Sequence, residues 1–278
     1  MRRRCGIIAL ASFAGLLMAQ TEPTNDGQHL DASSGEFNLS RDATLKKLRE
    51  DGFTKKLLTG ALGAASTDEV KAEAAKLRVK RGAKLAGVSV GAPNAKYDVI
   101  LQPGHYGRTK GATGASGAKV SEQEIVAYLV GSVAMRLKAS GFNVIVVPAD
   151  NTVAKNAMVF LAVHAEGSAS PCSAGPSLAY KEGTTPYAMH AVGLGISRAM
   201  GYDYKNFRAD GYTKNSSHYY MFNRVNAGRL TGLLEIGEIT CSNSERAMLV
   251  NVDRIAANLG PSAGRSILLI HRVDGCQR

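Results

Sequence analysis

The chain has 278 residues, of which 45% are hydrophobic and 21% are charged, so it can bury a sizeable core and is neither fibrous nor wholly disordered. Its formal net charge is +11. This surplus favours polyanionic partners such as wall polymers or membrane surfaces more generally than nucleic acid, although solubility alone would also account for it.

The first 19 residues have the organisation of a secretory signal. Arginines at positions 2–4 precede an apolar run over residues 7–19, which is shorter than the roughly 20 apolar residues of a membrane-spanning helix. We therefore expect export to the periplasm or the cell exterior, by either the general secretory or the twin-arginine route. Loss of the three arginines with the signal lowers the net charge from +11 to +8, because no acidic residue precedes Glu22.

Four cysteines occur, and Cys5 would leave with the signal. Cys172, Cys241 and Cys276 remain. An oxidising destination favours one disulfide with one thiol left over, and the spacing leaves the pairing open.

Residues 20–95 read as a linker followed by a small helical segment, with basic helical patterns at 42–62 and 67–81. From residue 96 to 278, short apolar runs alternate with helical periodicity. This alternation predicts an α/β domain with a twisted, mainly parallel sheet flanked by helices. The expected strands lie at 99–101, 144–147, 159–163, 219–222 and 230–234, and the expected helices begin at 122 and span 187–200 and 244–259.

Three of these apolar runs lead directly into a side chain suited to metal binding or acid–base chemistry. His105 follows the first run through Pro103-Gly104, His164 follows the third, and Glu235 follows Leu233-Leu234. A single histidine or glutamate after a strand is more often a structural residue than a ligand. Because the carboxyl ends of parallel strands share one edge of a sheet, the three together predict a common site.

A further ligand is expected from the helix that begins near Ser121. Ser121 as N-cap places Glu124 at the third helical position, where a carboxylate closes a capping box. Glu122 instead shares a face with Val126 and Leu129, at helical offsets of four and seven. We therefore expect Glu122 to point toward the sheet and Glu124 to serve the helix.

His105, Glu122 and His164 form a donor set typical of a catalytic zinc site, with a fourth position open for water. We expect about one Zn²⁺ per chain. A nearby carboxylate would then move the proton of the attacking water to a leaving amine. Glu235 is the expected general base, and Glu238 is a competitor that no longer follows the apolar run directly.

The motifs resemble, in order, those of the zinc-dependent N-acetylmuramoyl-L-alanine amidases of the third type, over roughly residues 96–260. The matching stretches are ILQPGH at 100–105 with Gly111, Ala112 and Gly114, EQEIV at 122–126, FLAVHA at 160–165, and LLEIG at 233–237 with Asn243 and Glu245. The resemblance implies hydrolysis of the amide between N-acetylmuramic acid and L-alanine in peptidoglycan, with Glu235 in the catalytic segment. It also implies a parallel sheet flanked by helices.

The chain departs from the family pattern at several positions. Tyr106 stands where a second glycine is usual, Glu166 where an asparagine is common, and Glu238 where an aromatic is common. The Thr-Arg pair that commonly follows the second strand is replaced around 147–150. None of these departures removes an expected ligand.

Two other functions remain open at this stage. One is a non-catalytic or regulatory protein that binds the cell wall on the same scaffold, and the other is a zinc peptidase that cuts stem peptides. Tyr106 and Arg108 flank the first histidine and are candidates for contact with glycan or peptide. The Gly-, Pro- and Ser-rich segment 169–187 is a candidate flap, which a regulatory or activator protein would hold shut or open.

A phosphate-loop function is excluded for the Gly-rich segment 111–119, because the Gly-Lys-Ser/Thr ending is missing.

Overall fold

The computed structural model describes residues 68, 71–72, 74–75, 85, 87–108, 111–181, 186–201 and 218–274. The expected signal segment, the linker, the helical pattern at 42–62 and Cys276 lie outside these residues. Asp68 and Lys71, from the second helical pattern, are helical and form an ion pair with 3.5 Å between Nζ and Oδ1. None of the described helices has the length and apolar character needed to cross a membrane.

The named elements of the domain run in the following chain order. They are β1 (Lys96–Pro103), α4 (Glu122–Ala139), β2 (Val144–Val146), β3 (Lys155–Glu166), β4 (Ser177–Tyr180), α5 (Pro186–Met200), the 3₁₀ helix η3 (Tyr220–Asn223), β5 (Val225–Glu238) and α7 (Ser242–Asp274).

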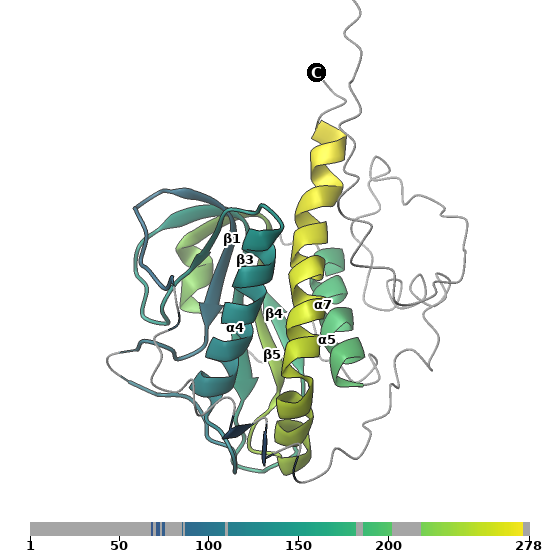
Figure 1. Ribbon diagram of the computed structural model, residues 1–278. Coiled ribbons are helices and arrows are strands. Elements are labelled where there is room, and N and C mark those ends of the chain that lie inside the picture. The colour runs from purple at the N-terminus through teal and green to yellow at the C-terminus, as the bar shows by residue number, and fades with distance from the viewer. Residues whose placement is uncertain are drawn as a thin grey trace, which may run out of the picture. The chain divides into compact units, whose positions relative to one another are not determined.

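The strands form one twisted sheet in the order β2-β1-β3-β5-β4 (Figure 1). The pairs β1–β2, β1–β3 and β3–β5 are parallel, and only β4 runs antiparallel, at one edge. The prediction of a mainly parallel sheet is therefore confirmed. Because β1, β3 and β5 are adjacent and parallel, their carboxyl ends meet at one edge of the sheet.

Three helices cover one face of this sheet. Figure 1 shows α4 and α7 side by side, with α5 on the other side of α7. The alternate residues of β3 explain this arrangement, because Val159, Leu161 and Val163 point into the core that the helices share, while Phe160 and Ala162 point to the opposite face. Burial on both faces accounts for the continuous apolar run of β3.

Among the described residues, the opposite face is covered by η3. Phe222 of η3 packs edge-to-face on Phe160, with 6.5 Å between the ring centroids. The aromatic run 219–222, expected to be a strand, was thus assigned wrongly. The run forms a tight turn, which the bond from Phe222 N–H to the Tyr219 carbonyl closes at 2.9 Å, and all four side chains pack in the cluster on this face.

Two other expectations from the sequence also differ from the structure. The antiparallel strand β4, which the sequence did not indicate, lies inside the candidate flap segment 169–187. Its four residues are too few to show an alternating pattern. In addition, α7 continues to Asp274, well past the expected end at residue 259.

Candidate metal centre

The first histidine is placed by a tight turn at the end of β1. Gly104 N–H donates to the Val163 carbonyl of β3 at 2.7 Å, which draws the turn against the neighbouring strand. A Cβ on Gly104 would come within 2.5 Å of His164 Nδ1, so only glycine fits this close approach. His105 follows in the left-handed region, with φ of 59°. The turn thereby directs its ring back over the sheet edge.

The glutamate is placed by the capping of α4. Ser121 is the N-cap, its N–H donates to Glu124 Oε2 at 2.7 Å, and its hydroxyl accepts from Glu124 N–H at 3.4 Å. The expected capping box is confirmed. Glu122 is directed inward and is only 3% exposed.

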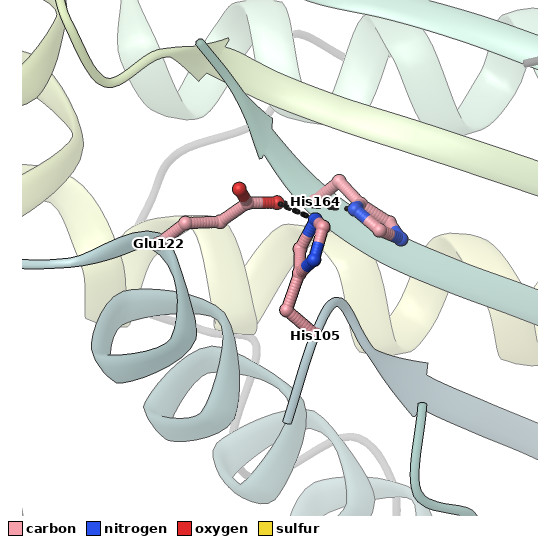
Figure 2. Close-up of side chains that lie close together, drawn as sticks. All are labelled: His105, Glu122 and His164. Atoms are coloured by element: carbon pink, nitrogen blue, oxygen red, sulfur yellow. Dashed lines mark hydrogen bonds and ion pairs between the residues drawn. The ribbon is translucent and has the colours of Figure 1, made fainter. Parts of the chain in front are cut away.

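His105, Glu122 and His164 come together at the carboxyl edge of the sheet (Figure 2). Glu122 Oε1 lies 3.0 Å from His164 Nδ1 and 3.4 Å from His105 Nε2. One donor atom from each residue lies within 4.8 Å of the other two. Two nitrogens and a carboxylate oxygen at this spacing offer a site for one divalent ion and match the ligand set of catalytic zinc.

Contacts with backbone groups hold the side chains of His105 and Glu122 in place. His105 Nδ1 lies 3.1 Å from the Ala112 carbonyl, which leaves Nε2 directed at Glu122. The Glu122 carboxylate accepts N–H bonds from Ala115 at 3.0 Å and from Ala165 at 3.2 Å. The geometry is therefore set before any ion binds.

The protonation of the group also suits a cation. Burial alone would raise the pKa of the Glu122 carboxyl, but the hydrogen bond and charge of His164, the charge of His105 and the Ala115 N–H hold it below its ordinary value. Burial lowers the pKa of His105, against the opposing charge of Glu122. An ionised carboxylate and a neutral imidazole are the forms that bind metal.

Glu235 lies beside this group, because β5 pairs with β3 in a register that sets Glu235 directly against His164. Its Oε2 atom is buried and has no hydrogen-bond partner among the described residues, and the same is true of His164 Nε2. Burial, followed by the charges of Glu122 and Glu166, raises the pKa of Glu235 well above its ordinary value. A buried polar atom without a partner marks a place for water or a ligand.

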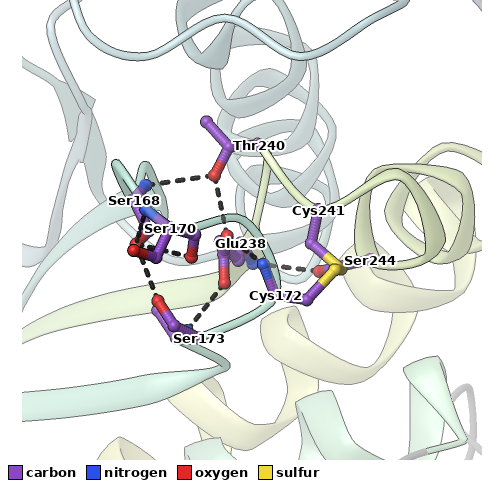
Figure 3. Close-up of a disulfide and its surroundings, with 9 residues drawn as sticks. Ser168, Ser170, Cys172, Ser173, Glu238, Thr240, Cys241 and Ser244 are labelled. Carbon is purple, nitrogen blue, oxygen red and sulfur yellow. Dashed lines mark hydrogen bonds between the residues drawn. A yellow bond between two sulfur atoms is a disulfide. The ribbon is translucent and has the colours of Figure 1, made fainter.

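Glu238, the competitor for the role of base, has a different task (Figure 3). Its carboxylate is fully buried and accepts N–H bonds from Cys172 and Ala174, both at 2.7 Å, and the Thr240 hydroxyl bond at 2.8 Å. A disulfide joins Cys172 to Cys241 next to it. Glu238 therefore anchors the loop 167–176 and has no oxygen directed at the candidate centre.

Glu245 anchors the Gly-rich loop 111–119 in the same way as Glu238 anchors the loop 167–176. It is 2% exposed and accepts N–H bonds from Ala118, Lys119 and Val120 at 3.2, 2.6 and 3.0 Å. The loop that resembles a phosphate cradle thus already holds a carboxylate of its own chain. This loop also contains Ala112 and Ala115, which orient two of the candidate ligands.

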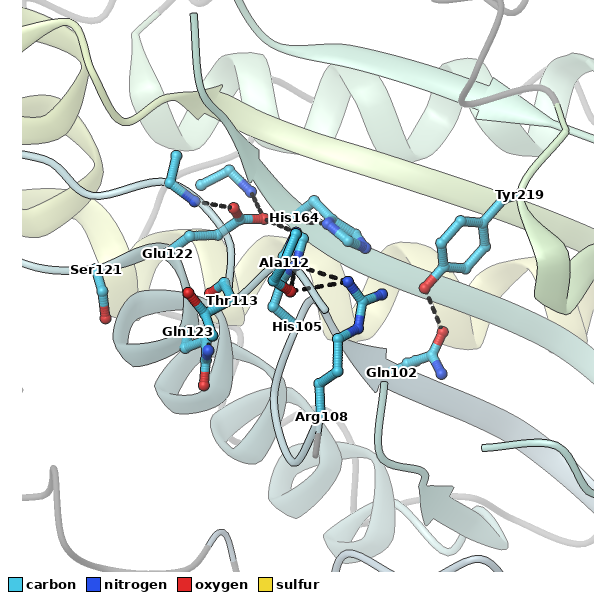
Figure 4. Close-up of polar contacts among 12 residues, drawn as sticks. Gln102, His105, Arg108, Ala112, Thr113, Ser121, Glu122, Gln123, His164 and Tyr219 are labelled. Carbon is cyan, nitrogen blue, oxygen red and sulfur yellow. Dashed lines mark hydrogen bonds and ion pairs between the residues drawn. The ribbon is translucent and has the colours of Figure 1, made fainter. Parts of the chain in front are cut away.

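Sequence reasoning missed a polar chain beside His164 (Figure 4). The Tyr219 ring stands edge-to-face to His164, with 5.7 Å between centroids, and its hydroxyl donates to Gln102 Oε1 at 2.8 Å. Gln102 is fully buried and donates to the Pro148 carbonyl at 2.7 Å. Burial raises the pKa of Tyr219, which keeps its hydroxyl protonated. In the sequence, the one histidine next to this group is His218, which directly precedes Tyr219, and its own side chain is exposed.

No family model and no curated protein matches the chain. Among solved structures, similar folds include the N-acetylmuramoyl-L-alanine amidase from Clostridium difficile 630, with 16% identity, a TM-score of 0.47, and coverage of 65% of this chain and 98% of that one. The catalytic domain of such an amidase from Bacillus (Paenibacillus) polymyxa has 20% identity, a TM-score of 0.46, and coverage of 64% and 99%. A third, from Nostoc punctiforme, has 17% identity, a TM-score of 0.45, and coverage of 66% and 99%. The function is therefore argued from the residues of the site and not from these similarities.

Proposed function

We propose that the chain is an exported zinc-dependent hydrolase that cleaves the amide between N-acetylmuramic acid and L-alanine in peptidoglycan. The observation that carries this proposal is the convergence of His105, Glu122 and His164 with Glu235 on the adjacent strand. The class of substrate is supported by the resemblance of the four sequence motifs, and export by the N-terminal pattern.

The donor set fits zinc, and zinc held there would supply a polarised carbonyl and an acidified water. His105, Glu122 and His164 would hold the ion. Glu235 would take the proton of the attacking water and deliver it to the nitrogen of L-alanine as the amide bond breaks. The raised pKa of Glu235, caused first by burial of its carboxyl, makes it a stronger base than an ordinary glutamate.

A digest of purified peptidoglycan, analysed by mass spectrometry, tests the reaction. Wild type with zinc should release stem peptides with a free L-alanine amino terminus, and chelator should abolish the release. Glu235→Gln should lower the rate by about 10²–10⁴-fold while zinc remains bound. Full activity of folded, zinc-loaded Glu235→Gln would remove Glu235 from the mechanism.

The same digest separates the two alternatives. A zinc peptidase would leave L-alanine on the lactyl group and cut further along the stem. A non-catalytic wall-binding protein would co-sediment with peptidoglycan at saturating zinc and release nothing.

A further inference from the structure

Arg108 lies beside the candidate centre on the loop that follows His105. Its N–H closes a turn on the His105 carbonyl at 3.3 Å. Its Nη1 donates to the Ala112 carbonyl at 2.9 Å and lies 3.3 Å from His105 Nδ1. Figure 4 shows the guanidinium between His105 and Tyr219. The guanidinium is therefore placed beside the candidate centre by its contacts with His105 and Ala112.

This charge has no anionic partner in the part of the chain that the structure describes. Among the described residues, Glu122 pairs with the two histidines and no carboxylate forms an ion pair with Arg108. Of the guanidinium nitrogens, only Nη1 makes a hydrogen bond to a described residue.

We propose that Arg108 binds a carboxylate of the substrate next to the scissile amide, namely the free carboxylate of the acidic residue that follows L-alanine in the stem peptide. This inference rests on the proposed function. An arginine presents its donors as a planar fork that matches a carboxylate. Arg108 Nη1 lies 3.3 Å from His105 Nδ1, so a carboxylate bound by the guanidinium would lie next to the candidate centre.

Two ligands that differ at one group test the proposal. They are N-acetylmuramoyl-L-alanyl-D-isoglutamate, with a free α-carboxylate, and the matching isoglutamine compound, in which that group is a carboxamide; the γ-carboxyl is amidated in both. The wild type should have a KM about tenfold lower for the carboxylate, as expected for a hydrogen-bonded charge. In Arg108→Gln the ratio of the two KM values should approach one. Arg108→Lys, which keeps the charge but loses the fork, should fall between.

Arg254→Gln is the matched control, because Arg254 is exposed on α7 and the net charge changes equally. It should keep the wild-type ratio. An unchanged ratio in Arg108→Gln overturns the proposal. So does an equal loss of kcat on both ligands, which would make Arg108 a group that acts on the scissile amide or on His105 instead.

Calorimetric binding of the same two ligands separates this proposal from the proposed function. The measurement uses zinc-loaded Glu235→Gln and the metal-free protein, with and without Arg108→Gln, so it needs no turnover. A carboxylate preference that disappears with Arg108 supports the proposal even if wild type hydrolyses neither ligand. Hydrolysis of both ligands with no preference in binding or KM overturns it and leaves the amidase intact.

Discussion

Glu122 and Glu235 are two carboxylates at one site whose surroundings push their pKa values apart. Glu122 is held by His164 and backbone N–H groups, which keep its pKa low despite burial. Glu235 is half-buried and has no such donors among the described residues, and its pKa is raised by the burial of its carboxyl and then by the charges of Glu122 and Glu166. In the proposed mechanism, this division suits Glu122 as the ligand that stays ionised and Glu235 as the group that exchanges protons.

The raised pKa of Glu235 has a consequence for stability in the metal-free protein. A carboxyl whose pKa is higher in the folded than in the unfolded state costs stability as the pH rises from its ordinary value of 4.5 through the folded pKa. Glu235→Gln removes that cost. We expect a higher thermal unfolding midpoint than wild type at pH 7 in the presence of chelator, and no gain at pH 4.

Glu238→Gln provides the contrast for this measurement. The amide would turn donors toward the N–H groups of Cys172 or Ala174, so the midpoint should fall at pH 7. A Glu235→Gln variant that is less stable than wild type at pH 7 would contradict the stated environment of Glu235.

The ligand assignment is tested by zinc content after dialysis. His105→Ala and His164→Ala should each reduce bound zinc from about one ion per chain to a small fraction, because each removes one of three protein ligands. Glu235→Gln should retain the ion. His218→Ala, at an exposed histidine, serves as the control. Wild-type zinc content in either His→Ala variant would remove that residue from the ligand set.

At the scale of elements, two buried glutamates hold the loops around the site, one at the end of β5 and one shortly after that strand. Glu238 fixes the loop 167–176 and Glu245, at the start of α7, fixes the Gly-rich loop. Both act on backbone N–H groups of segments distant in sequence. The rim of the site therefore depends on the position of β5 and α7 relative to the rest of the sheet.

Glu245→Ala should lower the free energy of unfolding by about 3–5 kcal/mol, because a buried acceptor of three N–H bonds is lost. It should also weaken zinc binding, since the loop carries the Ala112 and Ala115 contacts. Glu124→Ala, which removes the side-chain half of the capping box, should cost about 1 kcal/mol. Chemical denaturation gives both values, and equal costs would argue against the anchoring role of Glu245.

At the scale of the whole molecule, the Cys172–Cys241 disulfide joins the loop after β3 to the start of α7 across 69 residues. The sequence left the cysteine pairing open, and the structure pairs these two. A disulfide that closes a loop of this length lowers the conformational entropy of the unfolded chain. The relation between loop length and entropy gives a stabilisation of about 4 kcal/mol.

Cys172→Ser should therefore lower the free energy of unfolding by about 4 kcal/mol. The double variant Cys172→Ser with Cys241→Ser should unfold at the same midpoint as the single one. A reducing agent should shift the wild type to that midpoint and leave both variants unchanged. Insensitivity of the wild type to complete reduction would contradict a stabilising role for the bond.

The sequence by itself determined the mainly parallel sheet, the helix at Glu122 and the candidate residues at the strand ends. These features follow from local rules: a 2.0- or 3.6-residue period, a capping pattern, and the common edge of parallel strands. The capping argument that separated Glu122 from Glu124 needed only four consecutive residues, and the structure confirms it.

Only the tertiary structure decided the features that depend on residues far apart in the chain. The β3–β5 register sets Glu235 against His164, and the packing of α7 gives Glu245 to the Gly-rich loop and Cys241 to Cys172. The fold also assigns Glu238 to the loop 167–176. Such contacts are fixed by the closure of long chain segments on a shared core, which no local pattern records.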